Sequence, residues 1–428
     1  MDVNFFKKIV MVVALGSYSV FCHAELTIEI NEGTVVDGIP VAVVPFASQG
    51  APVDIGAIIN ADLARSGYFR MMPRGSMPSQ PSSASQVQFP QWQGLGQNYM
   101  AVGQINGNGG QYNVQFQLLD VSKGGAMMGY QMASSADDLR RTAHHIADLI
   151  FEKLTGKKGV FNGRIAYVTS DRKGKESQHK LQVSDTDGFN PQTIASSTQP
   201  LMSPSWSPDK KKVAYVSFEK HNAAIYVQTL ATGERTRVAE FPGINGAPAW
   251  SPDGSKLALT LSKDGSPDIY TLDVSSRVLR RITKSFSIDT EPVWSPDGNN
   301  IVFTSDRGGK PQLYITSSQG GGEEQRITFS GDYNARASFS PDGQNIAMVH
   351  GNGGDYRIAV LDVNSKGINV LTNGPSDESP SFAPNGSMIL YASKKGQTGF
   401  LSAVTLDGKM QQRMVFNSGE VREPAWAP

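Results

Sequence analysis

The chain has 428 residues, of which 39% are hydrophobic, and its 39 basic and 39 acidic residues give a formal net charge of zero. This length and hydrophobic content suit two or three folded domains and exclude a disordered protein. Because no positive field is available to gather nucleic acid or anionic lipid, we expect no nucleic-acid partner, and we expect partners to be recognised by shape and local polar contacts.

Residues 1–24 have the pattern of a secretory signal peptide. Two lysines precede an apolar stretch at residues 9–20, and a small-residue cleavage site lies just before Glu25. The apolar stretch is shorter than the about 20 residues that a membrane-spanning helix needs. We therefore predict an exported chain that does not span a membrane. The single cysteine, Cys22, is lost with the signal, so we expect neither a disulfide nor a cysteine metal site.

Residues 25–155 mix strand and helix patterns and predict an α/β domain. Apolar runs and alternation indicate strands, a Gly-rich turn at residues 106–110 joins two of them, and apolar residues at helical spacing indicate two helices. The predicted strands are residues 26–30, 41–44, 100–105, 112–121 and 127–132, and the predicted helices are residues 54–63 and 137–154. A polar linker at residues 156–163 follows.

A repeat organises the remaining residues, 164–428. The motif Pro-x-Trp-Ser-Pro-Asp-Gly at residues 248–254 returns at residues 292–298, and its aromatic recurs every 43 to 45 residues. This spacing leaves room for four strands in each unit, which is typical of a β-propeller blade. The recurring aromatics, interpreted as packing between blades, are Trp206, Trp250, Trp294, Phe339, Phe382 and Trp426.

The two ends of the repeat region predict how the ring closes. Residues 165–168 match the second strand of other units, but no Pro-x-Trp strand precedes them, and the missing strand is found at residues 424–426. We therefore expect the C-terminal strand to complete the first blade and remove the exposed sheet edge. The predicted fold is a multidomain chain in which an N-terminal α/β domain precedes an all-β six-bladed propeller closed by its C-terminal strand.

The meander of each blade places the Ser-Pro-Asp-Gly turns at one end of the ring and the loops that enter each innermost strand at the other. The entry loops differ from one another far more than the turns do, which is typical of a recognition face on a repeated scaffold. Charged residues cluster on these loops, where either a binding role or simple solvation explains them: Glu291, Arg336, Glu378, Arg422 and Glu423.

Catalytic and metal-binding arrangements are not predicted. The chain has no Gly-x-Ser-x-Gly motif and no phosphate-binding loop. Adjacent His144 and His145 point to different sides of a helix, so they are not expected to hold a metal together. The repeated aspartates are explained by turn capping: Asp209, Asp253, Asp297 and Asp342. We predict no catalytic residue, no metal and no cofactor.

More specific motifs extend over the whole chain. They are Val-Val-Pro-Phe at residues 43–46, Phe-Glu-Lys-Leu-Thr-Gly at 151–156, Pro-Leu-Met-Ser-Pro at 200–204, Asn-Gly-Ala-Pro at 245–248 and Thr-Glu-Pro at 290–292. With the signal and the two domains, they make the chain resemble the TolB family, the periplasmic component of the Tol-Pal envelope system. The resemblance implies a non-enzymatic, monomeric periplasmic scaffold that supports outer-membrane integrity and envelope constriction during cell division.

The resemblance also implies partners and the residues that bind them. The peptidoglycan-associated lipoprotein Pal is expected at the propeller mouth, which colicins also exploit, and TolA is expected at the mature N-terminus; other outer-membrane proteins are further partners. The residues implied for Pal are Leu201, Met202, Asn245, Ala247, Thr290, Glu291, Arg336, Glu378, Arg422 and Glu423, and those for TolA are Glu25, Leu26, Thr27, Ile28, Glu29 and Ile30.

Two other functions stay open from the residues alone. One is a secreted propeller-type hydrolase with its site at the mouth, which requires paired carboxylates or a nucleophile and base that converge there. The sequence offers Glu291 and Glu378 in different blades and no evident nucleophile. The other is a propeller that binds a small ligand in its channel.

Overall fold

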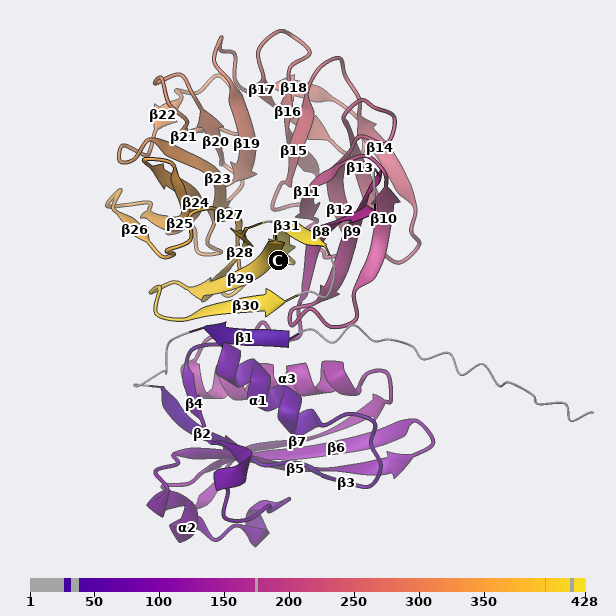
Figure 1. Ribbon diagram of the computed structural model, residues 1–428, viewed down its shortest axis with the longest axis vertical. Coiled ribbons are helices and arrows are strands. Elements are labelled where there is room, and N and C mark those ends of the chain that lie inside the picture. The colour runs from indigo at the N-terminus through magenta and orange to yellow at the C-terminus, as the bar shows by residue number, and fades with distance from the viewer. Residues whose placement is uncertain (1–26, 32–37, 174–175, 397, 416–418) are drawn as a thin grey trace, which may run out of the picture.

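The computed structural model describes residues 27–31, 38–173, 176–396, 398–415 and 419–428. These residues form an α/β domain followed by a six-bladed β-propeller, so the predicted fold class is confirmed (Figure 1). The predicted signal peptide, Glu25 and Leu26 lie outside the described residues. Within them, no helix is both long enough and apolar enough to cross a membrane.

One mixed sheet and two long helices make up the N-terminal domain. The sheet has the order β4-β2-β5-β6-β7, with β3 beside β5. Helices α1 and α3 contact each other and share one core with the sheet, built around Ile59, Phe116 and Ile150. The strands are β2 (Ile39–Val43), β3 (Ala47–Ser48), β4 (Phe69–Met71), β5 (Tyr99–Asn108), β6 (Gln111–Asp120) and β7 (Gly125–Ser135); the helices are α1 (Ile55–Arg65), α2 (Phe89–Gly94) and α3 (Leu139–Thr155).

Local signals set the ends of these helices. The Asp54 carboxylate accepts a hydrogen bond from the backbone N–H of Ala57, which caps the start of α1, and Gly156 ends α3 at a φ of 74°, where glycine has no steric cost. The strands predicted at residues 41–44, 100–105, 112–121 and 127–132 and both predicted helices are confirmed. Strands β3 and β4 and helix α2 were missed, because two, three and six residues are too short to show a period.

Each blade of the propeller is a four-stranded antiparallel meander. Its second strand is apolar on both faces, as in residues 213–216, because each sheet packs between two others. From the innermost strand outward, the first blade is β31 (Glu420–Trp426), β8 (Arg164–Lys173), β9 (Glu176–Asp185) and β10 (Gln192–Ser197), and the second is β11 (Leu201–Trp206), β12 (Lys212–Ser217), β13 (Ala224–Thr229) and β14 (Arg235–Ala239). The third blade is β15 (Asn245–Trp250), β16 (Lys256–Leu261), β17 (Asp268–Asp273) and β18 (Leu279–Arg281), and the fourth is β19 (Asp289–Trp294), β20 (Asn300–Ser305), β21 (Gln312–Ser317) and β22 (Gln325–Arg326). The fifth blade is β23 (Tyr333–Phe339), β24 (Asn345–Asn352), β25 (Asp355–Asp362) and β26 (Ile368–Val370), and the sixth is β27 (Glu378–Phe382), β28 (Met388–Lys395), β29 (Thr398–Thr405) and β30 (Gln411–Val415).

The ring closes as the repeat predicts. Strand β31 at the C-terminus pairs antiparallel with β8, with Trp426 opposite Ile165 and Val421 opposite Thr169. The first blade is therefore built from both ends of the propeller sequence, and the closed ring has no gap between its first and last blades.

Strand β1 (Thr27–Asn31) joins the propeller and not the sheet of the N-terminal domain, where we had placed it. It is a fifth, antiparallel strand on the last blade, with Thr27 opposite Val415 and Asn31 opposite Gln411. The physical reason is that β30 is the outer strand of its blade and offers unpaired backbone groups to another strand. In Figure 1, β1 lies between the propeller and the N-terminal domain.

The repeated turns and aromatics have the structural roles that we predicted. In the turn after β19, the Ser295 hydroxyl donates to the Asp297 carboxylate, which also accepts the backbone N–H of Asn299 at 3.0 Å. The same bonds recur at Asp209, Asp253 and Asp342. Between blades, Trp294 Nε1 donates to the carbonyl of Ala249 in the preceding blade at 3.1 Å.

The N-terminal domain packs against the turn end of the ring. Arg65 in α1 donates to the Thr186 hydroxyl in the β9–β10 turn at 3.0 Å, and the Asn385 side chain, in the β27–β28 turn, donates to the Lys158 carbonyl at 2.7 Å. We call this contact the seam. Because the entry loops lie at the opposite end of the ring, the seam leaves the mouth uncovered.

Candidate functional site

Every innermost strand is interrupted at the same place. Three residues before the recurring aromatic, the backbone adopts a positive φ of 46° to 56° at a residue other than glycine, and the pairing register with the second strand shifts there. Such bulges re-aim a side chain, and strained backbone of this kind gathers at functional sites. We call these six residues the inner ring: Ser203, Ala247, Glu291, Arg336, Ser379 and Glu423.

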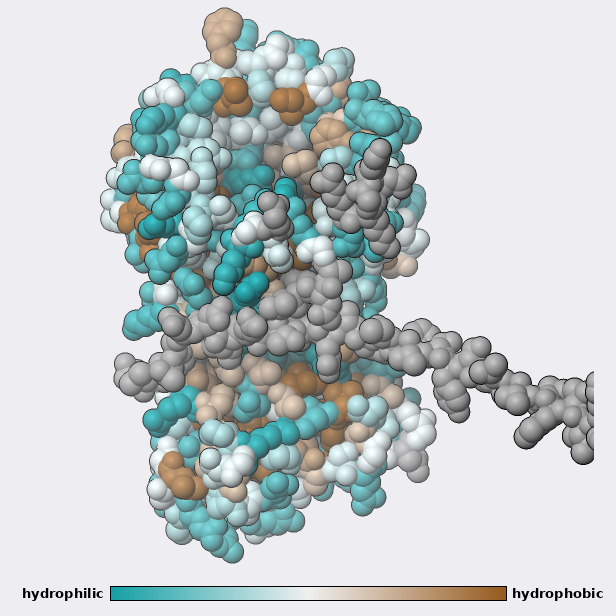
Figure 2. All heavy atoms as spheres, viewed as in Figure 1, coloured by the Kyte–Doolittle hydropathy of each residue, from teal (hydrophilic) through white to brown (hydrophobic). Residues whose placement is uncertain are grey.

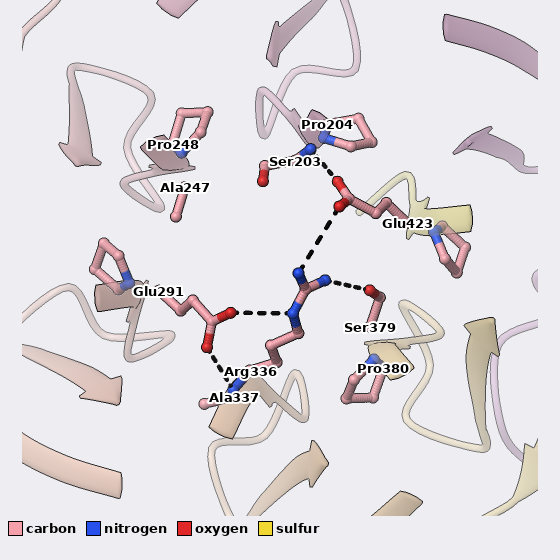
Figure 3. Close-up of a pocket in the computed structure, with 12 residues that line it drawn as sticks. Ser203, Pro204, Ala247, Pro248, Glu291, Arg336, Ala337, Ser379, Pro380 and Glu423 are labelled. Carbon is pink, nitrogen blue, oxygen red and sulfur yellow. Dashed lines mark hydrogen bonds and ion pairs between the residues drawn. The ribbon is translucent and has the colours of Figure 1, made fainter. Parts of the chain in front are cut away.

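The inner ring surrounds a small cavity at the centre of the propeller. Its volume is about 150 Å³, and the inner-ring residues line it together with the residue that follows each of them (Figure 3). Five of those following residues are prolines, whose fixed φ stiffens the bulge. Figure 2 shows hydrophilic residues in the hollow of the ring. Side chains from all six blades therefore meet in one polar, preformed centre.

Arg336 is the hub of this centre. Its Nε lies 3.0 Å from Glu291 Oε1, its backbone N–H donates to Glu291 Oε2 at 3.1 Å, and its guanidinium also donates to the Ser379 hydroxyl. Across the cavity, Arg336 Nη2 lies 3.8 Å from Glu423 Oε1, and the other oxygen of Glu423 accepts the backbone N–H of Ser203. One arginine thus joins the fourth, fifth, sixth and first blades (Figure 3).

Burial and charge set the protonation of these groups. Burial raises the pKa of Glu423, and Arg336 opposes that shift without cancelling it. Burial acts to lower the pKa of Arg336, but Glu291, Glu423 and Glu378 outweigh it, so that pKa is raised. Arg336 therefore stays charged, while Glu423 holds a proton more readily than a free glutamate does.

Four of the residues proposed for Pal line the central cavity together: Ala247, Glu291, Arg336 and Glu423. We predicted that Glu291, Arg336, Glu378, Arg422 and Glu423 lie on loops, and this is wrong. They lie inside β19, β23, β27 and β31, because the innermost strands begin two to four residues earlier than the Pro-x-aromatic motif suggests.

The other proposed residues lie outside the cavity lining. Met202 is exposed at the start of β11, whereas Leu201 is buried beside it. Asn245 is only 1% exposed, and its side chain bonds the backbone of Phe241, so it shapes its loop and presents no free amide. Thr290, Glu378 and Arg422 are half-buried, and Arg422 pairs with Glu420. Of the residues proposed for TolA, Thr27, Ile28, Glu29 and Ile30 form part of β1.

Sequence reasoning missed two inner-ring serines and an apolar surface at the mouth. Ser203 and Ser379 stand three residues before a recurring aromatic, so the repeat spacing could have found them. The apolar surface could not be found that way, because its residues sit at unrelated positions of the entry loops and of the β24–β25 hairpin. With Met202, these exposed residues, which we call the mouth collar, are Ile244, Phe286, Ile288, Phe329 and Tyr356.

The polar side chains that line the cavity are held by contacts with one another. The residues that line it include neither histidine nor lysine to activate a serine, and the Ser379 hydroxyl accepts a hydrogen bond from Arg336. The carboxylates of Glu291 and Glu423 are held by one guanidinium and by backbone N–H groups. This arrangement offers a fixed pattern of charge and hydrogen-bond groups to a ligand from outside.

Comparison with known proteins agrees with this architecture over most of the chain. The sequence-family model of the TolB amino-terminal domain matches residues 26–127, and the family model of the TolB beta propeller domain matches residues 151–428. The Tol-Pal system protein TolB of Methylococcus capsulatus is 59% identical over 406 residues, covering 95% of both chains, and that of Xanthomonas oryzae pv. oryzae (strain MAFF 311018) is 55% identical over 410 residues, covering 94% of this chain and 93% of the relative. The crystal structure of TolB from Acinetobacter baumannii superposes with a TM-score of 0.88 at 41% identity, covering 94% of this chain and all of that one. The chain belongs to the TolB family of the Tol-Pal system.

Proposed function

We propose that this protein is a non-enzymatic periplasmic scaffold that docks Pal at the propeller mouth and TolA at its mature N-terminus, and so supports outer-membrane integrity and envelope constriction during division. The observation that carries the proposal is the Arg336-centred inner ring, a polar centre held in place by four blades. A folded partner docks there with little loss of conformational entropy, because the groups it meets are already fixed.

The mouth collar supports docking of a protein over binding of a small molecule. A cavity of about 150 Å³ is small beside the several hundred Å³ of a typical ligand pocket. Around it stand large exposed apolar side chains, with Phe286 fully exposed and Phe329 67% exposed. Exposed aromatics around a polar, charged centre are what a partner protein can bury, and such aromatics commonly dominate binding energy.

Strand β1 supports the role proposed for the N-terminus. It pairs on one side with β30 and is the outermost strand of its blade, so its other edge faces no strand of this chain among the described residues. A strand edge without a partner strand can accept an added strand through backbone hydrogen bonds. TolA binding at residues 25–30 would use either this edge or the whole segment after it leaves β30.

The proposal is tested by measuring the affinity of Pal for paired variants. Phe286→Ala, in the mouth collar, should weaken Pal binding at least about tenfold. Val278→Ala is the control, because Val278 is also exposed but follows β17 at the turn end, and it should bind Pal normally. Equal affinity of the two variants would contradict docking at the mouth. Turnover of a hydrolase substrate, or saturable thermal stabilisation by a small metabolite, would instead favour the two alternatives.

Coupling between the N-terminus and the mouth requires that residues 25–33 have two states with different affinities for Pal. In the described residues β1 is paired to β30, and release of this strand would give a second state. Deleting residues 25–33 should abolish TolA binding and change Pal affinity. Lost TolA binding with unchanged Pal affinity would leave the two docking sites in place and remove the coupling.

A further inference from the structure

The seam holds a cluster of metal-ligating side chains from two domains. His144 comes from α3 of the N-terminal domain, and Asp185 and Asp187 come from the β9–β10 hairpin of the propeller. One potential ligand atom from each lies within 4.8 Å of the others, and His144 Nε2 lies 3.6 Å from Asp187 Oδ2. As predicted, His144 and His145 point to different sides of α3: His144 is only 2% exposed, whereas His145 is exposed to solvent.

The imidazole of His144 is oriented for a ligand at Nε2. Its Nδ1 lies 2.7 Å from Asp62 Oδ2 in α1, and both residues are buried. Asp62 also pairs with Arg65, and a carboxylate in this place accepts a hydrogen bond from Nδ1, which leaves Nε2 as the nitrogen that faces the cluster. Nε2 is buried and has no hydrogen-bond partner. A carboxylate that fixes the far nitrogen of a histidine is the usual support of a metal-bound imidazole.

Among the described residues, Asp185 is the carboxylate of the cluster without an ion pair. Arg65 pairs with Asp62, and Arg140 pairs with Asp187. Asp185 takes part in no such pair, and its carboxylate lies close to that of Asp187 and to His144 Nε2. Neighbouring carboxylates beside an imidazole nitrogen are a ligand set that a cation can bind.

Space is available beside these residues. A cavity of about 490 Å³ opens at the seam and is lined by His144, Asp185, Arg140 and Arg164. Arg140 does not depend on Asp187 alone, because its guanidinium lies 3.7 Å from the ring centroid of Phe189. It can therefore share the Asp187 carboxylate with an ion and remain packed.

We propose that His144, Asp185 and Asp187 form a binding site for a divalent ion of the zinc class, which ties the N-terminal domain to the propeller. One imidazole nitrogen with two carboxylates suits Zn²⁺ or Co²⁺ better than Ca²⁺ or Mg²⁺, which prefer six or more oxygens. Metal bonds of about 2.0 to 2.2 Å place tetrahedral ligand atoms roughly 3.3 Å apart, so the 3.6 Å separation of His144 and Asp187 needs little movement. Water would complete the fourth position.

The test uses the full mature chain, stripped of metal with a chelator and titrated with Co²⁺ and then Zn²⁺. We expect one equivalent of Co²⁺ to bind saturably with the intense visible absorption of a four-coordinate ion, and Zn²⁺ to displace it and raise the melting temperature. Asp185→Asn should weaken binding at least about tenfold, as is usual for loss of a ligand or its support. His145→Gln is the matched control on the same helix and should bind as the parent does.

Two results would overturn the proposal: the absence of saturable one-to-one binding to the parent chain, or equal Co²⁺ affinity in the parent and Asp185→Asn. His144→Gln is expected to lose the visible absorption completely. Because that change also disturbs the buried contact with Asp62, its melting temperature without metal is measured beside it. Asp185→Asn leaves the contact between His144 and Asp62 intact, so its Co²⁺ affinity tests the proposal even if His144→Gln does not fold.

Discussion

The two ends of the propeller satisfy their polar side chains in different ways. At the turn end, the repeated Ser and Asp side chains are satisfied within their own turn: Ser295, Asp297 and the backbone of Asn299 bond one another. At the mouth end, polar groups are satisfied across blades, as when Arg336 reaches Glu291 and Glu423. A turn whose hydrogen bonds are all internal can be repeated unchanged from blade to blade, whereas a network that crosses the ring requires neighbouring blades to carry different residues.

This difference between the two ends explains why we expect a partner protein to bind at the mouth end. The turn end repeats one chemical pattern, and its remaining surface near the first and last blades is occupied by the N-terminal domain. The mouth end carries six different inner-ring environments and the exposed mouth collar. Specificity for one partner needs such non-equivalent positions, since identical loops would present the same surface six times.

The largest expected effect comes from removing residues 421–428. This deletion takes away most of β31, which pairs with β8, together with Glu423 of the inner ring. We expect aggregation, or a melting temperature lower by on the order of 10 °C or more, because the edge of β8 becomes exposed and the ring opens. Removal of Pro428 alone, an exposed residue, is the control and should melt as the parent does. A soluble deletion with parental melting would show that closure by β31 is dispensable.

Arg336→Met tests the network across blades. It keeps an apolar stem of similar length but leaves Glu291 and Glu423 without their shared cation, which should cost about 3 kcal/mol of unfolding free energy in urea titrations. Arg357→Met is the control, because Arg357 forms an exposed pair with Asp355 and should cost less than about 1 kcal/mol. Adding Glu291→Gln and Glu423→Gln to Arg336→Met should restore much of the lost unfolding free energy. If the triple variant shows no recovery, packing of the arginine stem, and not its charge, stabilises the ring.

The smallest effect is expected at the turn end. Asp297→Ala removes an exposed carboxylate whose bonds are local, and it should cost about 1 kcal/mol at neutral pH. The Ser295 hydroxyl and the Asn299 backbone N–H lower the pKa of Asp297, so its contribution is present above its ordinary pKa and is lost as the pH falls through the lowered value. The difference between parent and variant should therefore shrink below about pH 3 in denaturant titrations. A difference that is unchanged with pH would argue against the ionised carboxylate as its source.

Much of the fold was determined by local sequence. The blade count, the turn chemistry and the closing strand all follow from the motif around Trp250 and Trp294, because each unit folds by contacts within about 44 residues and repeats them. The helices at residues 54–63 and 137–154 could be predicted for a similar reason, because the residues that cap each helix and form its apolar face all lie within one short segment of the chain. Short elements such as β4 could not, because three residues contain no period.

The sites were decided by the tertiary structure. Nothing in sequence spacing places Arg336 between Glu291 and Glu423, because these residues meet only when the ring closes through a strand from the far end of the chain. The pairing of β1 with β30 depends in the same way on an edge formed some 380 residues later. His144 and Asp187 likewise meet only when two domains pack. Local periodicity encodes the repeated scaffold, whereas buried charges need partners that the chain brings together only in the folded molecule.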